Sequence, residues 1–338
     1  GGDPYSIVPT RDTNGHGTNM AGIMGAKGQN PLLTGAAPDA RFIIVKLRLS
    51  NTATFISLEN DFNTPVYTDA DIIMALKYVF TQARSENIPA SVLLPLSANF
   101  SPHDGSLIIE QYIDYISTFA GIVITVPAGN EGFSDTHTEG RLQETGASEV
   151  IELQVGEGER NVIFDIWFQS PDRVAISITS PSGEIIERIP IQERALQRST
   201  FVFERTEAFV FYNTPDPNTG DENITVLLTN LVAGIWKFTL FGEAIYNGNY
   251  NAWLPNRMLL KEGTRFLSAS QNTTITSPST AARAISVGFY NQNTNTADAR
   301  SGRGFTRTGA VKPDLVAGGV DALVISPGGG TTTRTGSS

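Results

Sequence analysis

Residues 121–132 read GIVITVPAGNEG, an apolar run that ends in an asparagine within a glycine-rich turn. A short run rich in Ile and Val, bounded by Gly and Pro, is typical of a buried β-strand. Asn130 follows the carboxyl end of this predicted strand, which is where open α/β sheets bind their ligands. An asparagine amide at that position can donate an N–H to a developing oxyanion. The plain alternative is an ordinary turn after a strand.

The segments around this strand alternate between strand and helix patterns. Apolar runs predict strands at 41–48, 90–96 and 284–289, and amphipathic patterns predict helices at 70–87 and about 107–119. Strands that alternate with helices of this length indicate a parallel sheet. The predicted fold class is therefore α/β, with a parallel sheet that carries helices on both faces.

The hydrophobic period changes to two between Val150 and about Leu254. Apolar residues alternate there with polar ones in three clear stretches, at 162–168, 174–178 and 236–240. Turn residues separate these stretches, which predicts an antiparallel β-sandwich inserted into the α/β domain. The predicted division is a first α/β part at 1–148, the sandwich at 149–268 and a second α/β part at 269–338.

The composition narrows the classes of function. The 338 residues include 24 Lys and Arg against 34 Asp and Glu, a net charge of −10, and no cysteine. An acidic chain argues against binding to nucleic acid or to anionic membranes. The lack of cysteine excludes a disulfide scaffold, a thiol nucleophile and cysteine-bound zinc. The longest apolar stretch, residues 119–128, is too short to cross a bilayer, so membrane insertion is not expected.

Two further segments carry reactive side chains. His16 lies between two glycines at the start of a helix-compatible run, where small neighbours let a substrate backbone approach the imidazole. A lone histidine in such a run is more often structural. Ser338 ends a Gly-x-Ser step, which can present a hydroxyl at a sharp turn, although flexible chain ends contain the same residues.

In their order along the chain, these three segments resemble the subtilisin-like serine peptidases. HGTNMAG at 16–22 is close to the family's His-Gly-Thr-His-Val-Ala-Gly. AGNEG at 128–132 matches its oxyanion segment, and GSS at 336–338 stands where Gly-Thr-Ser carries the nucleophile. Two weaker matches are LSAN at 96–99, which resembles the substrate-pairing strand, and VKPDLVAGGV at 311–320, which resembles the segment before the nucleophile loop.

The resemblance implies a serine endopeptidase with a Ser/His/Asp triad. Ser338 would be the nucleophile, His16 the general base and Asn130 the oxyanion donor. The implied substrate-binding residues are Leu96, Ser97, Ala98, Asn99 and Gly129. No cofactor is expected. Structural calcium is common among subtilisins, but no ligand set for it, or for any other metal, can be named in this sequence.

The triad aspartate has no match in the sequence. Subtilisin-like enzymes run Asp, His, Ser along the chain, and only fifteen residues precede His16. The resemblance therefore places the aspartate segment, and the helix after the serine, outside the 338 residues. We expect Asp12 to hydrogen-bond locally, at a turn or helix start. Since loss of the aspartate costs about 10⁴ in kcat, the chain by itself is expected to be inactive or nearly so.

A narrower resemblance is to the clostridial Csp germination proteases. The matching segments are DADIIMA at 69–75, SPHDG at 101–105, VGEGER at 155–160 and PDR at 171–173. Proteins of this branch carry a jelly-roll domain between the oxyanion asparagine and the nucleophile. Here 208 positions separate Asn130 from Ser338, and the period-two block lies between them. The branch implies a protein or peptide substrate and an extracellular or spore-associated location.

Two other functions stay open on the sequence. A pseudoprotease that uses the fold for binding or sensing is known in the same branch, although the reactive residue types at His16, Asn130 and Ser338 argue against it. The sandwich could instead be an independent carbohydrate- or protein-binding module. Its tryptophans fall mostly at core-compatible alternating positions, which favours packing; they are Trp167, Trp236 and Trp253.

Several other polar residues are expected to be structural. His103 and His137 lie in polar loops without paired ligands at usable spacing, so a surface or loop-stabilising role is favoured over a metal site. Arg300, Arg303 and Arg307 form a small basic cluster near the C-terminus, which we expect to be solvated.

Overall fold

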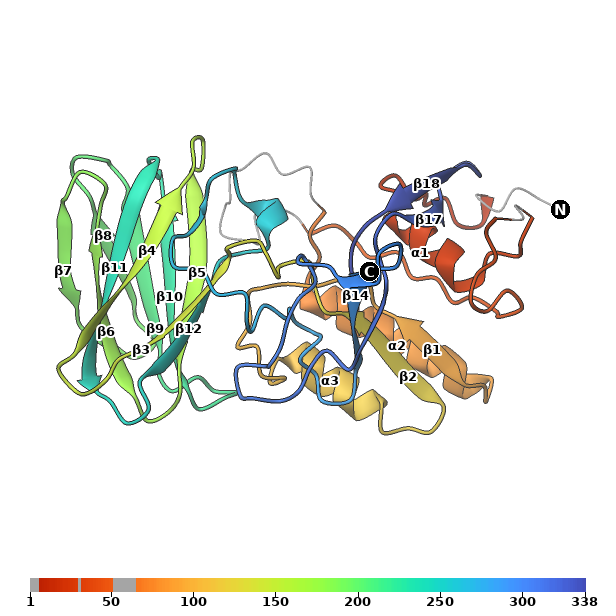
Figure 1. Ribbon diagram of the computed structural model, residues 1–338. Helices are drawn as coiled ribbons and strands as arrows, with labels where there is room; N and C mark the ends of the chain where they lie inside the picture. Colours follow the sequence, from red (N-terminus) through yellow and green to blue (C-terminus); the bar gives the residue numbers. More distant parts are fainter. Residues whose placement is uncertain (1–5, 30–31, 51–64) are drawn as a thin grey trace.

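The computed structural model describes residues 6–29, 32–50 and 65–338. Figure 1 shows an α/β part on the right, which contains the C-terminus, and two antiparallel sheets on the left. The helices are α1 (His16–Gly25), α2 (Asp69–Ser85) and α3 (Ile108–Ile116), and the 3₁₀ turn η2 spans Arg257–Leu259. This arrangement confirms the predicted class of an α/β sheet with a separate antiparallel part.

The α/β part is built on a sheet with β2 (Ile122–Pro127) at its centre. β2 pairs in parallel with β1 (Ala90–Leu93) on one side and with β14 (Ile285–Asn291) on the other. β14 also pairs in parallel with β16 (Leu315–Gly318) and antiparallel with the short β15 (Thr296–Ala297). The strand predicted at 121–127 is thus confirmed, and β14 joins it from beyond the sandwich.

Two of the helices cover one face of this sheet. α2 begins at Asp69 because the Thr68 hydroxyl accepts the backbone N–H of Asp71 at 3.2 Å, which caps the first turn. The buried side chains of α2, α3 and β2 form one apolar cluster, which includes Leu76, Ile113 and Ile124. α1 packs instead against β17 (Ala322–Ile325), which pairs with β18 (Thr331–Arg334). Within the described residues, α2 and α3 thus contribute to one apolar cluster against β2.

The buried strand predicted at 41–48 does not form. These residues have no strand assignment, and Ile44 is 68% exposed. An apolar run becomes a strand only when a neighbouring strand accepts its backbone groups. Within the described residues, β1 pairs only with β2, so the prediction was wrong for lack of a ladder partner.

The period-two block forms a sandwich of two antiparallel sheets. In spatial order, the six-stranded sheet contains β3 (His137–Arg141), β12 (Asn249–Trp253), β5 (Asn161–Phe168), β10 (Glu222–Thr229), β9 (Glu207–Asn213) and β8 (Leu196–Thr200). The five-stranded sheet contains β13 (Arg265–Phe266), β4 (Ser148–Val155), β11 (Gly234–Ala244), β6 (Arg173–Thr179) and β7 (Ile185–Ile189). The predicted domain boundaries and the jelly-roll connection stay predictions. β3 lies before the predicted boundary at residue 149 but pairs with β12 of the six-stranded sheet.

Alternate residues of the two sheets meet in the sandwich core. Phe164 of β5 packs edge-on against Phe238 of β11, with 4.8 Å between the ring centroids, and Trp236 is fully buried beside Phe201. Rings in this geometry stabilise a core beyond their buried area. The alternation read from the sequence therefore corresponds to the inward-facing side of each strand.

The outward-facing side of the six-stranded sheet is partly buried as well. Directly paired residues of neighbouring strands share a face. A row of such residues crosses this face from β3 to β9 and consists of His137, Trp253, Asp165, Thr225 and Phe211. Trp253 is stacked between His137 and His103, with 4.9 Å and 4.0 Å between the ring centroids. Both histidines are buried at the junction with the α/β part, and neither is at the surface.

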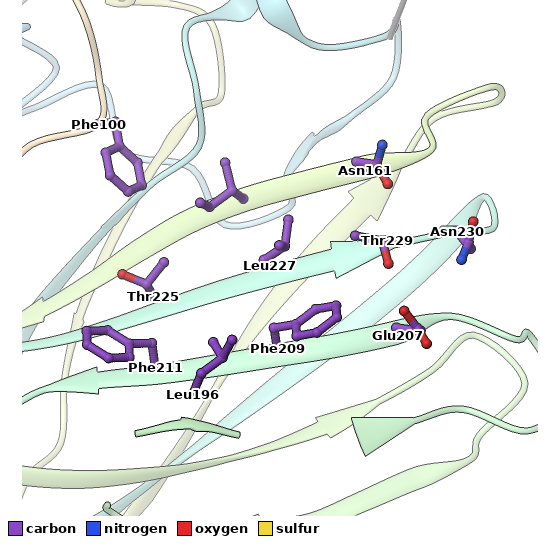
Figure 2. A pocket seen from close by; sticks show the side chains of 11 residues that line it. Phe100, Asn161, Leu196, Glu207, Phe209, Phe211, Thr225, Leu227, Thr229 and Asn230 are labelled. Carbon is purple, nitrogen blue, oxygen red and sulfur yellow. The ribbon is translucent and has the colours of Figure 1, made fainter. Parts of the chain in front are cut away.

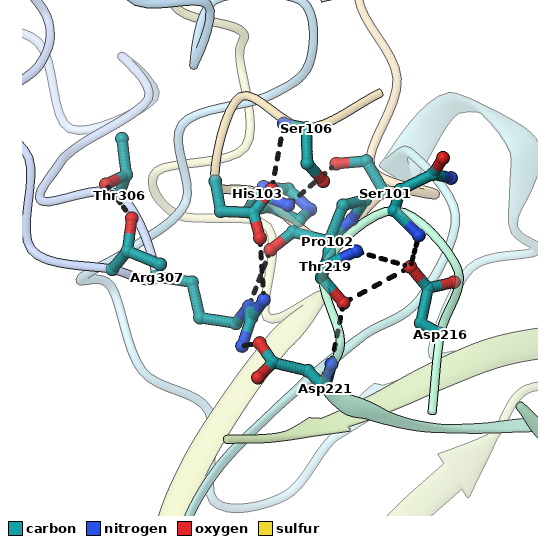
Figure 3. Close-up of polar contacts among 12 residues, drawn as sticks. Ser101, Pro102, His103, Ser106, Asp216, Thr219, Asp221, Thr306 and Arg307 are labelled. Atoms are coloured by element: carbon teal, nitrogen blue, oxygen red, sulfur yellow. Dashed lines mark hydrogen bonds and ion pairs between the residues drawn. The ribbon is translucent and has the colours of Figure 1, made fainter. Parts of the chain in front are cut away.

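Arg307 closes the same junction and corrects the expectation of a solvated arginine. Its side chain is only 5% exposed and pairs with Asp104 at 2.8 Å and with Asp221 of the sandwich at 2.7 Å (Figure 3). Its Nε also donates to the Pro102 carbonyl at 2.7 Å. One guanidinium thus joins the loop after β1 to the loop before β10.

The rest of the outward face is open. A groove of about 670 Å³ runs over β5, β10 and β9 beside Phe100 (Figure 2). Its apolar lining includes Phe209, Phe211 and Leu227. None of the three tryptophans lines it; Trp167, Trp236 and Trp253 are at most 5% exposed, as the packing interpretation predicts.

Replacing Arg307 by Met should strongly destabilise the protein, because Asp104 and Asp221 would keep buried charges without a cation. We expect the free energy of unfolding to fall by about 3–5 kcal/mol. The measurement is urea unfolding followed by tryptophan fluorescence. Trp167 contributes to this signal, and its ring lies 5.2 Å from the Arg307 guanidinium.

Lys237→Met is the matched control, since Lys237 pairs with Glu152 on the surface with its side chain 51% exposed. Its loss should cost less than about 1 kcal/mol. Equal losses for the two variants would contradict the importance assigned to the junction.

Candidate active site

The turn after β2 carries Asn130 at the edge of the sheet. Gly129 has φ +96°, and a Cβ there would lie 2.5 Å from the Thr276 hydroxyl, so this position requires glycine. Neighbouring segments hold the turn on both sides: the N–H of Gly302 donates to the Gly129 carbonyl at 2.9 Å, and that of Gly132 donates to the Arg300 carbonyl at 3.0 Å. Asn130 itself is exposed.

Ser337 sets the orientation of the Asn130 amide. The Ser337 backbone N–H and hydroxyl both donate to Asn130 Oδ1, at 2.9 Å and 3.1 Å. The Gly129 N–H in turn donates to the Ser337 hydroxyl oxygen at 3.2 Å. Because Oδ1 is occupied, Nδ2 is the free end of the amide, and it has no hydrogen-bond acceptor among the described residues.

Ser338 lies beside the carboxyl end of the β1 segment. Its hydroxyl donates to the Pro95 carbonyl at 3.4 Å. Gly336 precedes it with φ +151°, and a Cβ there would come within 3.2 Å of Asn130 Nδ2. A side chain at 336 would therefore crowd the amide that Ser337 orients. Segments 129–130 and 336–338, which sequence reasoning placed in one site, do meet in space.

His16 is the first residue of α1, and Asp12 holds the start of this helix. Asp12 accepts the N–H groups of Gly15 at 2.7 Å and Thr18 at 2.8 Å, and the Thr18 hydroxyl at 2.7 Å. Partial burial alone would raise the pKa of Asp12. The hydrogen bonds outweigh this effect and lower the pKa to about 2. The local helix-start role predicted for Asp12 is confirmed.

The surroundings of His16 favour its neutral form. Burial lowers the pKa of the imidazole below its usual value, and the charge of Arg334 lowers it further, while Asp12 opposes the change. A neutral imidazole can accept a proton near neutral pH, as a general base must. Within the described residues, no hydrogen bond joins the His16 ring to Ser338.

The segment predicted to bind substrate lies partly at the surface. Ser97 and Ala98 are exposed and Leu96 is half-buried. Ala98 exchanges backbone hydrogen bonds with Ser277, at 2.9 Å and 3.0 Å, so its own N–H and carbonyl are already occupied. Asn99 is 1% exposed, so its side chain is not available at the surface.

Two residues near this site were missed by sequence reasoning. Ser337 orients Asn130 across 207 positions, and no local pattern signals a contact of that range. Glu131 was quoted only as part of the AGNEG motif, yet it is 5% exposed and its carboxylate accepts the Arg257 N–H at 3.1 Å. The signal available in the sequence was the AGNEG motif itself.

The segment at 311–320 supports the sheet next to this site. Lys312 donates to the Asp314 carboxylate at 2.7 Å and to the Ala284 carbonyl at 2.8 Å. The same carboxylate accepts the Ser286 N–H at 2.7 Å, at the start of β14. The Lys-Pro-Asp part of this segment therefore fixes β16 beside β14.

Neither a metal cluster nor a bilayer-spanning helix is found in the part of the chain that the structure describes. Residues 6–29, 32–50 and 65–338 contain no group of three His, Asp or Glu side chains placed to hold an ion. No helix in those ranges is long and apolar enough to cross a membrane.

Comparisons with known proteins point to one family. The model of the subtilase family matches residues 2–153. The structure of the Clostridium perfringens CspB protease superposes with a TM-score of 0.87 at 30% identity, covering 100% of this chain and 68% of that one.

A curated relative agrees with this assignment. The major intracellular serine protease of Bacillus subtilis (strain 168) is 26% identical over 182 residues, which are 53% of this chain and 48% of the relative. The chain thus spans about half the length of that relative. With the TM-score of 0.87 to the CspB protease and the match over residues 2–153, these similarities assign the family: the chain belongs to the subtilases.

Proposed function

We propose that this chain forms the core of a serine endopeptidase that cleaves protein substrates. The observation that carries the proposal is the meeting of the Asn130 turn with the segment 336–338 at the carboxyl edge of the parallel sheet. The Ser338 hydroxyl, the free Nδ2 of Asn130 and the segment that follows β1 thus lie at the same edge of the sheet. The subtilase family supplies the reaction class.

In the proposed reaction, the Ser338 hydroxyl attacks the scissile carbonyl carbon while His16 takes its proton. The carbonyl oxygen becomes an oxyanion, stabilised by Asn130 Nδ2 and the Ser338 N–H. The C–N bond then breaks, and the imidazolium returns the proton to the leaving amine. Water hydrolyses the acyl-enzyme by the same steps and restores the Ser338 hydroxyl.

Asp12 does not serve as the triad carboxylate in this proposal. It is the carboxylate whose charge acts on His16, but its oxygens are engaged by the first turn of α1. An aspartate in that role must bind the imidazole and hold its tautomer. We therefore propose that the 338-residue chain reacts slowly by itself. The jelly-roll character of the sandwich and an extracellular or spore-associated location rest on the Csp resemblance and are proposed on that basis.

Asn130→Ala should lower kcat about 10²–10³-fold, because one oxyanion donor is lost while the proposed substrate-binding segment at 96–98, called the substrate strand below, is unchanged. KM should change little. The measurement is steady-state cleavage of a peptide ester by a form of the protein that includes a triad aspartate. Asn249→Ala, at an exposed position of the sandwich strand β12, serves as the control; a similar kcat for Asn130→Ala and wild type would contradict the assignment.

The 338-residue chain should label with a fluorophosphonate about 10⁴-fold more slowly than a subtilase with a complete triad, because Asp12 is engaged elsewhere. Mass spectrometry of the labelled serine measures the rate. Labelling of Ser338 at the rate of a complete enzyme, abolished in Ser338→Ala, would show that the chain needs no further carboxylate.

Arg334→Gln should move the acid limb of the kcat/KM profile to higher pH. The charge of Arg334 lowers the pKa of His16, so its removal lets the imidazole keep a proton to higher pH, and the neutral base is lost earlier on acidification. The measurement is kcat/KM between pH 4 and 8, a range chosen around the ordinary histidine pKa of about 6.5. An unchanged or lowered limb would exclude His16 as the titrating base.

A further inference from the structure

Four buried residues, through their side chains and one backbone N–H, form a closed ring of hydrogen bonds next to the candidate site. The Asn99 N–H donates to Asn256 Oδ1 at 3.0 Å, and Asn256 Nδ2 lies 3.5 Å from Glu131 Oε1. Glu131 Oε2 accepts the Thr136 hydroxyl at 3.2 Å, and Thr136 Oγ1 accepts Asn99 Nδ2 at 3.2 Å. No member is more than 8% exposed. Little solvent therefore reaches the ring in its intact state.

The ring joins the two segments that border the proposed reaction. Asn99 directly continues the segment 96–98, where substrate is expected to pair. Glu131 directly follows Asn130, so a shift of its side chain moves the peptide that carries the oxyanion donor. The separation of the substrate strand from the oxyanion donor therefore depends on the ring.

Asn256 brings the sandwich into this arrangement. It lies between the end of β12 at Trp253 and the turn η2, where the chain leaves the six-stranded sheet. The flanking backbone is anchored at the same place: the Leu254 N–H donates to the Thr136 carbonyl at 2.9 Å, and the Arg257 N–H donates to Glu131 Oε2 at 3.1 Å. The segment between β12 and β13 thus contacts both Asn99 and the turn that carries Glu131.

The Glu131 carboxylate makes the ring sensitive to the loss of any partner. Its neighbours in the ring are neutral donors, and a buried carboxylate must be hydrogen-bonded to stay in place. If one donor is removed, the carboxylate is expected to turn toward other donors or to admit water. Either change displaces residue 131 and the amide at 130.

We propose that Asn256 is a positioning residue: it sets the distance between the substrate strand and the Asn130 amide, and through it the inserted sandwich controls the rate of peptide cleavage. This inference rests on the proposed function. Asn256 touches neither substrate nor the reacting atoms and acts through Glu131 and Asn99.

The test is a double-mutant cycle of Asn256→Ala with Asn130→Ala, in a form of the protein that includes a triad aspartate. We expect Asn256→Ala to lower kcat about tenfold with KM changed less than about twofold, because an oxyanion donor acts mainly in the transition state. In the Asn130→Ala background the same substitution should lower kcat less than about twofold, since the donor that it displaces is already absent.

Asn249→Ala is the matched control, because Asn249 lies on β12 with an exposed side chain for which no hydrogen bond is found in the described residues. It should leave kcat unchanged in both backgrounds. Thr136→Val removes the hydroxyl on the other side of the ring at nearly constant side-chain volume. It should lower kcat as Asn256→Ala does, and this loss should likewise be absent in the Asn130→Ala background. It decides the test if Asn256→Ala does not fold.

The outcomes separate this inference from the proposed function. A wild-type protein that includes a triad aspartate but cleaves no substrate and does not label at Ser338 overturns the proposed function. An active wild type whose kcat is unaffected by opening the ring overturns the inference alone. The same loss of kcat with and without Asn130 also overturns it, because the ring would then act elsewhere. Loss of folding in both ring variants overturns it too, since the ring would hold the fold instead of placing Asn130.

Discussion

The parallel pairing of β2 between β1 and β14 is the constraint on which the candidate site depends. Parallel strands end at the same edge of a sheet, so the segments that follow β1 and β2 emerge side by side. The Asn130 turn can then bind residues 336–337, and Ser338 can reach the Pro95 carbonyl. Without this pairing, the residues of the site would have nothing to bring them together.

The sandwich is attached to this sheet by buried contacts as well as by the chain. The Trp253 stack and the two ion pairs of Arg307 lie where the outward face of the six-stranded sheet meets the loop after β1. A freely hinged insertion would leave such groups exposed, because buried charges are costly unless they are paired. These contacts make the junction one packed unit, in which a displacement on one side is felt on the other.

The sequence predicted the regular parts of this structure better than its long-range contacts. The strand at 121–127 and the alternation in β5, β6 and β11 were recognisable because both reflect local periodicity. The strand at 41–48 was wrong because pairing depends on a neighbour that an apolar run does not specify. The burial of His103 and Arg307 was missed because it is created by two distant segments packing together. For the site, the motifs located Asn130, but the partner that orients its amide, Ser337, is 207 positions away.

The insertion of the sandwich between β2 and β14 has a consequence for synthesis on the ribosome. β2 ends at residue 127 and β14 begins at residue 285, so β2 leaves the ribosome long before its central partner exists. At roughly 5–20 residues per second, the wait is about 8 to 30 s. The sandwich, whose strands all lie between these two, can fold during that interval. The nascent chain must therefore keep an apolar, unpaired edge of β2 from aggregating while a complete second core forms beside it.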